Sequence, residues 1–97
     1  MSTTPARIAL ITGAGTGIGR AAALALLNDG WRVVLAGRRL APLQETAAQA
    51  GEHASNALPM VADVTQAESV AALFARCQSH FGRLDMLFNN EIGRAHV

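Results

Sequence analysis

The stretch Leu10-Ile11-Thr12-Gly13-Ala14-Gly15-Thr16-Gly17-Ile18-Gly19-Arg20 decides the fold of this chain. The apolar run 8–11 belongs to a strand pattern, and a segment rich in alanine and leucine follows with helical spacing. This order predicts a buried strand, a tight glycine turn and the start of a helix within about 20 residues. Glycine at 13 allows backbone angles closed to other residues, so the chain can turn sharply at the end of the strand.

The helix that follows this turn is a predicted anion site. Its first amides have no partners within the helix and lie at the positive end of the helix dipole. Gly17 has no side chain to keep a pyrophosphate from the backbone, and Gly19 lets the helix pack closely on the sheet. An ordinary turn is the alternative, but the flanking strand and helix favour dinucleotide binding. The predicted cofactor-binding residues of this stretch are Gly13, Ala14, Gly15, Thr16, Gly17, Ile18 and Gly19.

Strand and helix patterns alternate along the rest of the chain. We expect strands at about 7–11, 32–36, 58–62 and 84–88, with helices at about 17–29, from 41 to near 51, and from 65 onward. Alternation of this kind favours a parallel sheet with right-handed crossovers. The predicted fold class is therefore α/β: the N-terminal half of a Rossmann-type doubly wound sheet, with about four strands in the order 3-2-1-4 and three helices.

Several local signals refine this prediction. In the first helix Ile18, Ala21, Ala22, Ala25 and Asp29 share one face, and Gly30 is a plausible C-cap. Residues 52–56 read as a polar loop, and proline at 59 places its strand at an edge of the sheet or bends its start. Residues 65–68 form a capping box, and the third helix carries an apolar stripe made of Val70, Leu73, Phe74, Cys77 and Phe81.

Composition narrows the class of protein. The 97 residues are 51% hydrophobic and 15% charged, with a formal net charge of +1, which argues against a surface dedicated to nucleic acid. We find no signal peptide and no apolar run long enough to span a membrane, so we expect a cytoplasmic protein. The single cysteine, Cys77, excludes an internal disulfide and fits a small core residue. Because His53, His80 and Cys77 have no ligand spacing, we expect no metal site.

Gly37-Arg38-Arg39 follows the second predicted strand, where a dinucleotide-binding fold selects its cofactor. An acidic residue there would bind the ribose hydroxyls of NAD, whereas arginine would accept the 2′-phosphate of NADP. A guanidinium is planar, permanently charged and able to hold a phosphate through two hydrogen bonds. The pair therefore favours NADP(H) over NAD(H). The alternative is that Arg38 and Arg39 are solvated loop charges.

The spacing Thr-Gly-x-x-x-Gly-x-Gly at 12–19 resembles that of the short-chain dehydrogenase/reductase family, in its single-domain subgroup. Two further segments agree in register with that family. Asp63-Val64 resembles its acidic-aliphatic pair beside the adenine ring, although Asp63 could instead help start the next helix. Asn89-Asn90 resembles the first half of its Asn-Asn-Ala-Gly signature, which helps to seat the cofactor ribose. We therefore interpret residues 1–90 as an NAD(P)-binding Rossmann half-domain.

The resemblance implies hydride transfer between a nicotinamide cofactor and a carbonyl or alcohol substrate, in an enzyme that is often a homo-oligomer. The family's catalytic serine, Tyr-x-x-x-Lys pair and supporting asparagine would all lie downstream. This chain contains no tyrosine, and its eight basic residues are all arginine, so it holds no catalytic residue and we expect it to be inactive alone. A non-catalytic dinucleotide sensor or scaffold is the alternative function.

The last seven residues depart from the family pattern, which calls for Ala-Gly after Asn90. Residues 91–97 can be encoded by GAG ATC GGA AGA GCA CAC GTC followed by a TGA stop, which matches a widely used sequencing-library adaptor. We therefore expect a non-native tail produced by adaptor read-through. The alternative is a naturally short product, and the nucleotide sequence beyond codon 90 distinguishes the two.

Overall fold

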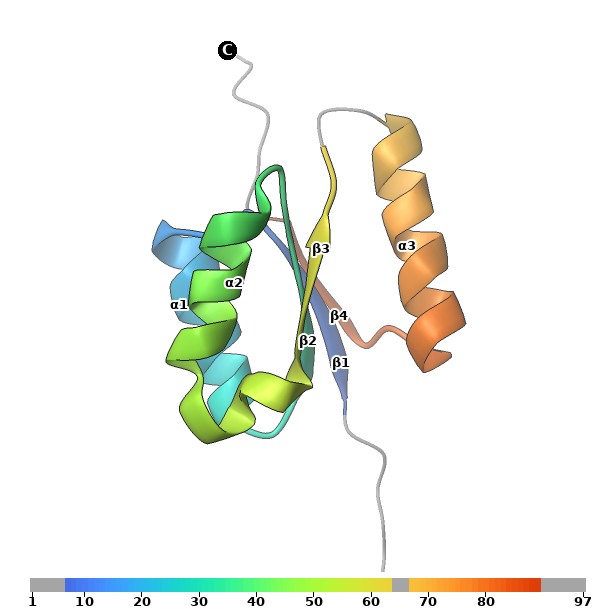
Figure 1. Cartoon of the computed structure of the whole chain (residues 1–97). Coiled ribbons are helices and arrows are strands. Elements are labelled where there is room, and N and C mark those ends of the chain that lie inside the picture. The colour runs from blue at the N-terminus through green and yellow to red at the C-terminus, as the bar shows by residue number, and fades with distance from the viewer. Residues whose placement is uncertain (1–6, 64–66, 90–97) are drawn as a thin grey trace, which may run out of the picture.

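A computed structural model of the chain describes residues 7–63 and 67–89. Their centre is a parallel sheet with the strand order β3-β2-β1-β4 (Figure 1). The strands are β1 (Ile8–Thr12), β2 (Arg32–Gly37), β3 (Ala57–Val61) and β4 (Met86–Asn89). The predicted α/β fold class and the predicted order 3-2-1-4 are both confirmed.

Helices cover both faces of this sheet. Helices α1 (Gly17–Asn28) and α2 (Leu40–Gln49) lie on one face, and α3 (Ala67–Phe81) lies on the other (Figure 1). A short 3-10 helix, η1 (Gly51–Asn56), leads from α2 into β3 where we predicted a polar loop. The His53 amide donates to the Ala50 carbonyl at 3.0 Å, a short-range bond of the kind that turns such a connector into a 3-10 helix.

Strand β1 joins the two halves of the core. All five of its residues are buried, and alternate side chains point to opposite faces of the sheet. Ala9 and Ile11 pack in the cluster that contains the buried residues of α1 and α2. Leu10 packs in the second cluster, with Leu73 and Cys77 of α3. The near-continuous apolar run is thus explained by burial on both sides.

The side of α1 that meets the sheet is not the face shared by Ile18, Ala21, Ala22, Ala25 and Asp29. The buried residues of this helix are Gly19, Ala23 and Leu27, whereas Ile18 is 70% exposed. Ala21, Ala22 and Ala25 lie together on the face with Ile18, whereas the buried side carries Ala23 and the fully buried Leu27. Gly19 lies on this buried side too, where the lack of a Cβ lets the helix axis approach the sheet closely.

The other local signals agree with the structure. Gly30 has φ of 93°, as a C-capping glycine requires, and Pro59 lies in an edge strand. In α3, Leu73 and Cys77 are buried, and Phe74 and Phe81 pack against them. The Val70 side chain and the capping-box residues 65 and 66 lie outside what the structure describes.

Candidate functional site

The glycine-rich turn lies at the carboxyl edge of the sheet, between β1 and α1. Gly13 has φ of 64°, the left-handed conformation expected for a sharp exit from the strand. The next residue is fastened to the neighbouring strand, since the Ala14 amide donates to the Ala36 carbonyl at 3.1 Å. The turn is therefore held against the end of β2.

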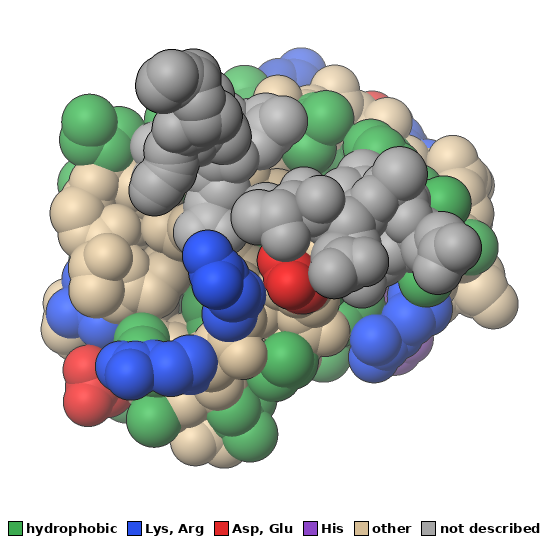
Figure 2. All heavy atoms as spheres, turned by 90° about the horizontal axis from the view of Figure 1, so that it is seen from above, with side chains coloured by type: hydrophobic (Ala, Val, Ile, Leu, Met, Phe, Trp, Pro, Cys, Tyr) green, Lys and Arg blue, Asp and Glu red, His purple; other side chains and the backbone are tan. Residues whose placement is uncertain are grey.

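Beside this turn lies an open hollow of about 340 Å³. One wall comes from the turn, and the other comes from the end of β2 and the start of α2. Basic side chains gather on the face seen from the carboxyl ends of the strands (Figure 2). The lining residues are Gly13, Gly15, Thr16, Gly37, Arg38, Arg39, Pro42 and Leu43.

The N-terminus of α1 is not capped by the side chain of its N-cap residue. Thr16 occupies the cap position, but its side chain makes no capping hydrogen bond, and the first turn of the helix carries no acidic residue. A Cβ added at Gly17, whose φ is 58°, would meet no atom within 4 Å. This helix start therefore presents backbone to open space, and its dipole favours an anion there.

Arg38 and Arg39 form the basic part of the opposite wall. Both side chains are exposed, and Arg39 is the residue from which α2 begins. Gly37 before them is buried, and a Cβ there would lie 3.1 Å from Leu43 Cδ2. Close packing of β2 on α2 thus sets where the two arginines leave the sheet.

The remaining predicted site residues do not line this hollow, or they lie outside the residues that the structure describes. Asp63 is half-buried and follows β3 at the same edge of the sheet, but it is not among the described residues that line the hollow. Asn89 ends β4 opposite Thr12, and its side chain is not described. Val64 and Asn90 lie outside the described residues. Of the glycine stretch, Ala14, Gly17, Ile18 and Gly19 contribute backbone near the turn without lining the hollow.

Sequence reasoning missed the contribution of α2 to the site. Pro42 and Leu43 line the hollow, and a Cβ added at Gly15 would lie 2.7 Å from Pro42 Cβ. Gly15 is therefore required because it has no Cβ, which lets the turn touch the helix. Its backbone freedom is not the reason. The one available signal was the proline itself, which marked the start of the helix but not its contact.

Outside this hollow, the described parts of the chain show no second candidate site among their metal-ligating side chains or at the cysteine. Within residues 7–63 and 67–89 no three histidine, cysteine or acidic side chains come together as metal ligands. Cys77 is fully buried, and this burial raises the pKa of its thiol. None of the described helices has the length and apolar character needed to cross a membrane.

Comparison with known proteins agrees with this geometry. The family model of the short chain dehydrogenases matches residues 7–93. An uncharacterized oxidoreductase of Staphylococcus aureus is 43% identical over 84 residues, which are 87% of this chain and 36% of that protein.

Two solved structures extend the agreement to the fold. A 3-ketoacyl-(acyl-carrier-protein) reductase from Brucella melitensis, complexed with NADH, has a TM-score of 0.75 at 34% identity, over 86% of this chain and 33% of that one. A short chain dehydrogenase/reductase from Burkholderia phymatum, in complex with NAD, has a TM-score of 0.77 at 30% identity, over 90% and 31%. The chain thus spans about a third of the length of these proteins. With its glycine turn, strand order and matched family model, this chain belongs to the short-chain dehydrogenase/reductase family.

Proposed function

We propose that this chain binds a nicotinamide dinucleotide, with NADP(H) favoured over NAD(H), in the hollow between the glycine-rich turn and the start of α2. The observation that carries the proposal is the uncapped start of α1 beside a pair of exposed arginines. The pyrophosphate would lie on the backbone of Gly15 to Gly19, where amides and helix dipole favour negative charge.

The preference for NADP(H) rests on Arg38 and Arg39. They line the hollow that Gly13, Gly15 and Thr16 line from the other side. A 2′-phosphate in this position would be held by charge-assisted hydrogen bonds from the two guanidinium groups. The two similar structures named above contain NADH and NAD, which supports a nicotinamide dinucleotide.

We further propose roles at the edge of the sheet for the residues that do not line the hollow. Asp63 would accept a hydrogen bond from the adenine amino group, with Val64 as an apolar neighbour. Asn89 and Asn90 would help to seat the cofactor ribose, because an amide side chain both donates and accepts. These assignments follow from the family resemblance and the position of each strand end.

In the whole protein we propose an oxidoreductase that acts on a carbonyl or alcohol substrate, working in the cytoplasm as a homo-oligomer. The nicotinamide would supply the hydride-transfer chemistry, as hydride donor to a carbonyl or hydride acceptor from an alcohol, and the protein would supply placement and proton transfer. The 97 residues contain neither tyrosine nor lysine, so we expect them to bind cofactor without turning over substrate.

The test is a fluorescence titration of the chain with NADPH and with NADH. Arg38→Asp should weaken NADPH binding by about tenfold or more, since a favourable charge pair becomes a repulsion. Arg32→Asp is the matched control, because Arg32 opens β2 at the opposite, amino end of the sheet and changes the charge equally. An unchanged ratio of the two affinities in Arg38→Asp would remove the argument for NADP(H). Lack of binding of either dinucleotide to the folded chain would contradict the site itself.

A non-catalytic sensor or scaffold is the second candidate, since binding a dinucleotide in the hollow needs none of the catalytic residues that the family carries downstream. The two functions use the same hollow and differ in what the whole protein adds. A Tyr-x-x-x-Lys pair about 60 residues beyond the Asn-Asn segment means an enzyme, and its absence means a binding protein.

A further inference from the structure

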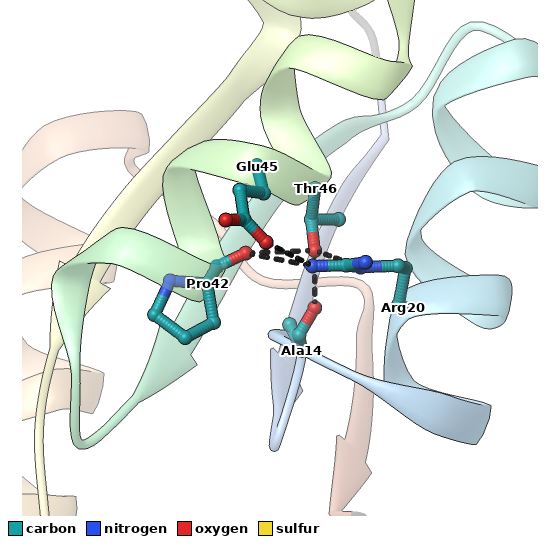
Figure 3. Close-up of polar contacts among 5 residues, drawn as sticks. All are labelled: Ala14, Arg20, Pro42, Glu45 and Thr46. Carbon is teal, nitrogen blue, oxygen red and sulfur yellow. Dashed lines mark hydrogen bonds and ion pairs between the residues drawn. The ribbon is translucent and has the colours of Figure 1, made fainter.

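Three segments meet at one buried hydroxyl group. Thr46 of α2 is fully buried, and its Oγ1 donates a hydrogen bond to the Ala14 carbonyl in the glycine-rich turn at 2.8 Å (Figure 3). The same oxygen accepts a hydrogen bond from Arg20 Nε of α1, also at 2.8 Å. The turn, α1 and α2 are therefore joined through a single side chain.

The donors and acceptors in this cluster fix the direction of each bond. A threonine hydroxyl has one hydrogen, and Thr46 Oγ1 lies within reach of both the Ala14 and the Pro42 carbonyls, at 2.8 and 3.1 Å. Arg20 Nη2 donates to the Pro42 carbonyl at 3.2 Å and also pairs with Glu45 at 3.4 Å. Because the Arg20 guanidinium already donates to the Pro42 carbonyl, the Thr46 hydroxyl hydrogen is directed to the nearer carbonyl, that of Ala14.

This cluster joins the two walls of the hollow. Ala14 stands between Gly13 and Gly15, which line the wall formed by the turn, and Pro42 lines the wall formed by α2. Among the described residues, neither Arg20 nor Thr46 lines the hollow itself. Their effect on a ligand would thus be indirect, through the distance between the walls.

We propose that Thr46, oriented by Arg20, is a positioning residue that sets the separation between the phosphate-binding turn and the arginines at the start of α2. The inference rests on the dinucleotide site proposed above. A ligand with a 2′-phosphate would touch both walls, whereas one without it depends mainly on the turn. Loss of the link should therefore weaken NADPH binding more than NADH binding.

The test compares Thr46→Val with Thr46→Ser in the 97-residue chain. Valine keeps the shape of threonine and leaves the Ala14 carbonyl buried without this donor, whereas serine keeps the hydroxyl. We expect Thr46→Val to raise the Kd for NADPH by about tenfold and to lower the NADPH-to-NADH affinity ratio, with Thr46→Ser close to the original chain. Circular dichroism and a denaturant titration establish that each variant is folded at the temperature of the binding measurement.

Two further variants separate positioning from loss of stability. Arg20→Met removes the donor but keeps an apolar stem, and it should lower the same affinity ratio even if Thr46→Val does not fold. Leu73→Val weakens the core on the opposite face of the sheet and should leave the ratio unchanged while the chain stays folded.

The outcomes are distinct. An unchanged ratio in folded Thr46→Val or Arg20→Met would overturn the positioning role, as would a Thr46→Ser variant that behaves like Thr46→Val. Failure of the original, folded chain to bind either dinucleotide would instead overturn the proposed function, and the positioning role with it.

Discussion

Ile8 and Asp85 are joined by two hydrogen bonds, although they lie 77 positions apart in the chain. The Ile8 amide donates to Asp85 Oδ2 at 2.8 Å, and the Asp85 amide donates to the Ile8 carbonyl at 2.9 Å. Arg83 Nη2 holds the other carboxylate oxygen at 2.6 Å. A side chain thus begins the pairing of β1 with β4, one residue before β4 itself.

This arrangement makes stability depend on pH. The hydrogen bonds from Arg83 and then from the Ile8 amide lower the pKa of Asp85 in the folded chain. A carboxyl with a lower pKa in the folded state stabilises it above the unfolded-state pKa, and this contribution is lost as pH falls through the folded-state value. We expect Asp85→Asn to be less stable than the original chain at pH 7, with the difference shrinking as the pH falls through and below the ordinary pKa range of an aspartate, about 4. Urea titrations at several pH values measure it, and a difference that stays constant with pH would contradict it.

Gly15→Ala should destabilise the chain through the contact with α2. The added Cβ would lie 2.7 Å from Pro42 Cβ, in a rigid ring that has no other rotamer. Overpacking of this kind costs about 1–3 kcal/mol. A double-mutant cycle with Pro42→Gly, which removes the opposing atom, should recover most of that cost. Equal effects of Gly15→Ala in both backgrounds, measured by denaturant unfolding, would show that the contact is not the cause.

Cys77 should be unreactive while the chain is folded. It is fully buried against Leu10 and Leu73, and this burial raises the pKa of its thiol, so little thiolate is present or accessible. We expect a thiol reagent at pH 8 to label the native chain about a hundredfold more slowly than the chain in urea. Cys77→Ser provides the unlabelled control. Similar labelling rates in the two conditions would mean that α3 does not stay packed on the sheet.

The open edge of β4 should cause self-association. An apolar groove between α1 and β4 is lined by Ala22, Ala25, Leu26, Met86, Leu87 and Phe88. Met86 and Leu87 are 40% and 45% exposed, and an exposed apolar strand edge promotes pairing with other chains. We expect the 97-residue chain to associate at micromolar concentration and Leu87→Lys to reduce this. Sedimentation velocity measures both, and a sharp, reversible melt of a monomer would contradict the prediction.

The fold could be predicted from sequence because its signals are local and consistent. The apolar run at β1, the glycine turn and the alternation of patterns all point to one parallel sheet, and the strand order is confirmed. The ends of β4 could not be predicted, since they depend on the bonds between Ile8 and Asp85. On α1, the sequence correctly placed Gly19 against the sheet, but the grouping of Ala21, Ala22 and Ala25 with Ile18 marked a side other than that of the buried Ala23 and Leu27, because small apolar residues are tolerated at exposed positions of a helix.

Both walls of the hollow were predicted in part. Gly13, Gly15 and Thr16 line the hollow together with Arg38 and Arg39, and both groups stand out in the sequence by composition and by position after a strand. Pro42 and Leu43, which α2 adds to the wall with the arginines, carry no such signal in the sequence. Thr46 reads as an ordinary helix residue until the fold brings it to Ala14, 32 positions earlier in the chain.

Ala14 has its amide bonded to β2 and its carbonyl bonded to α2. These two hydrogen bonds hold the loop that would meet an anion before any ligand binds. The conformational entropy cost of ordering the loop is therefore part of folding and not of binding. Binding at this loop then loses little freedom, and any opening of α2 would release the loop along with it.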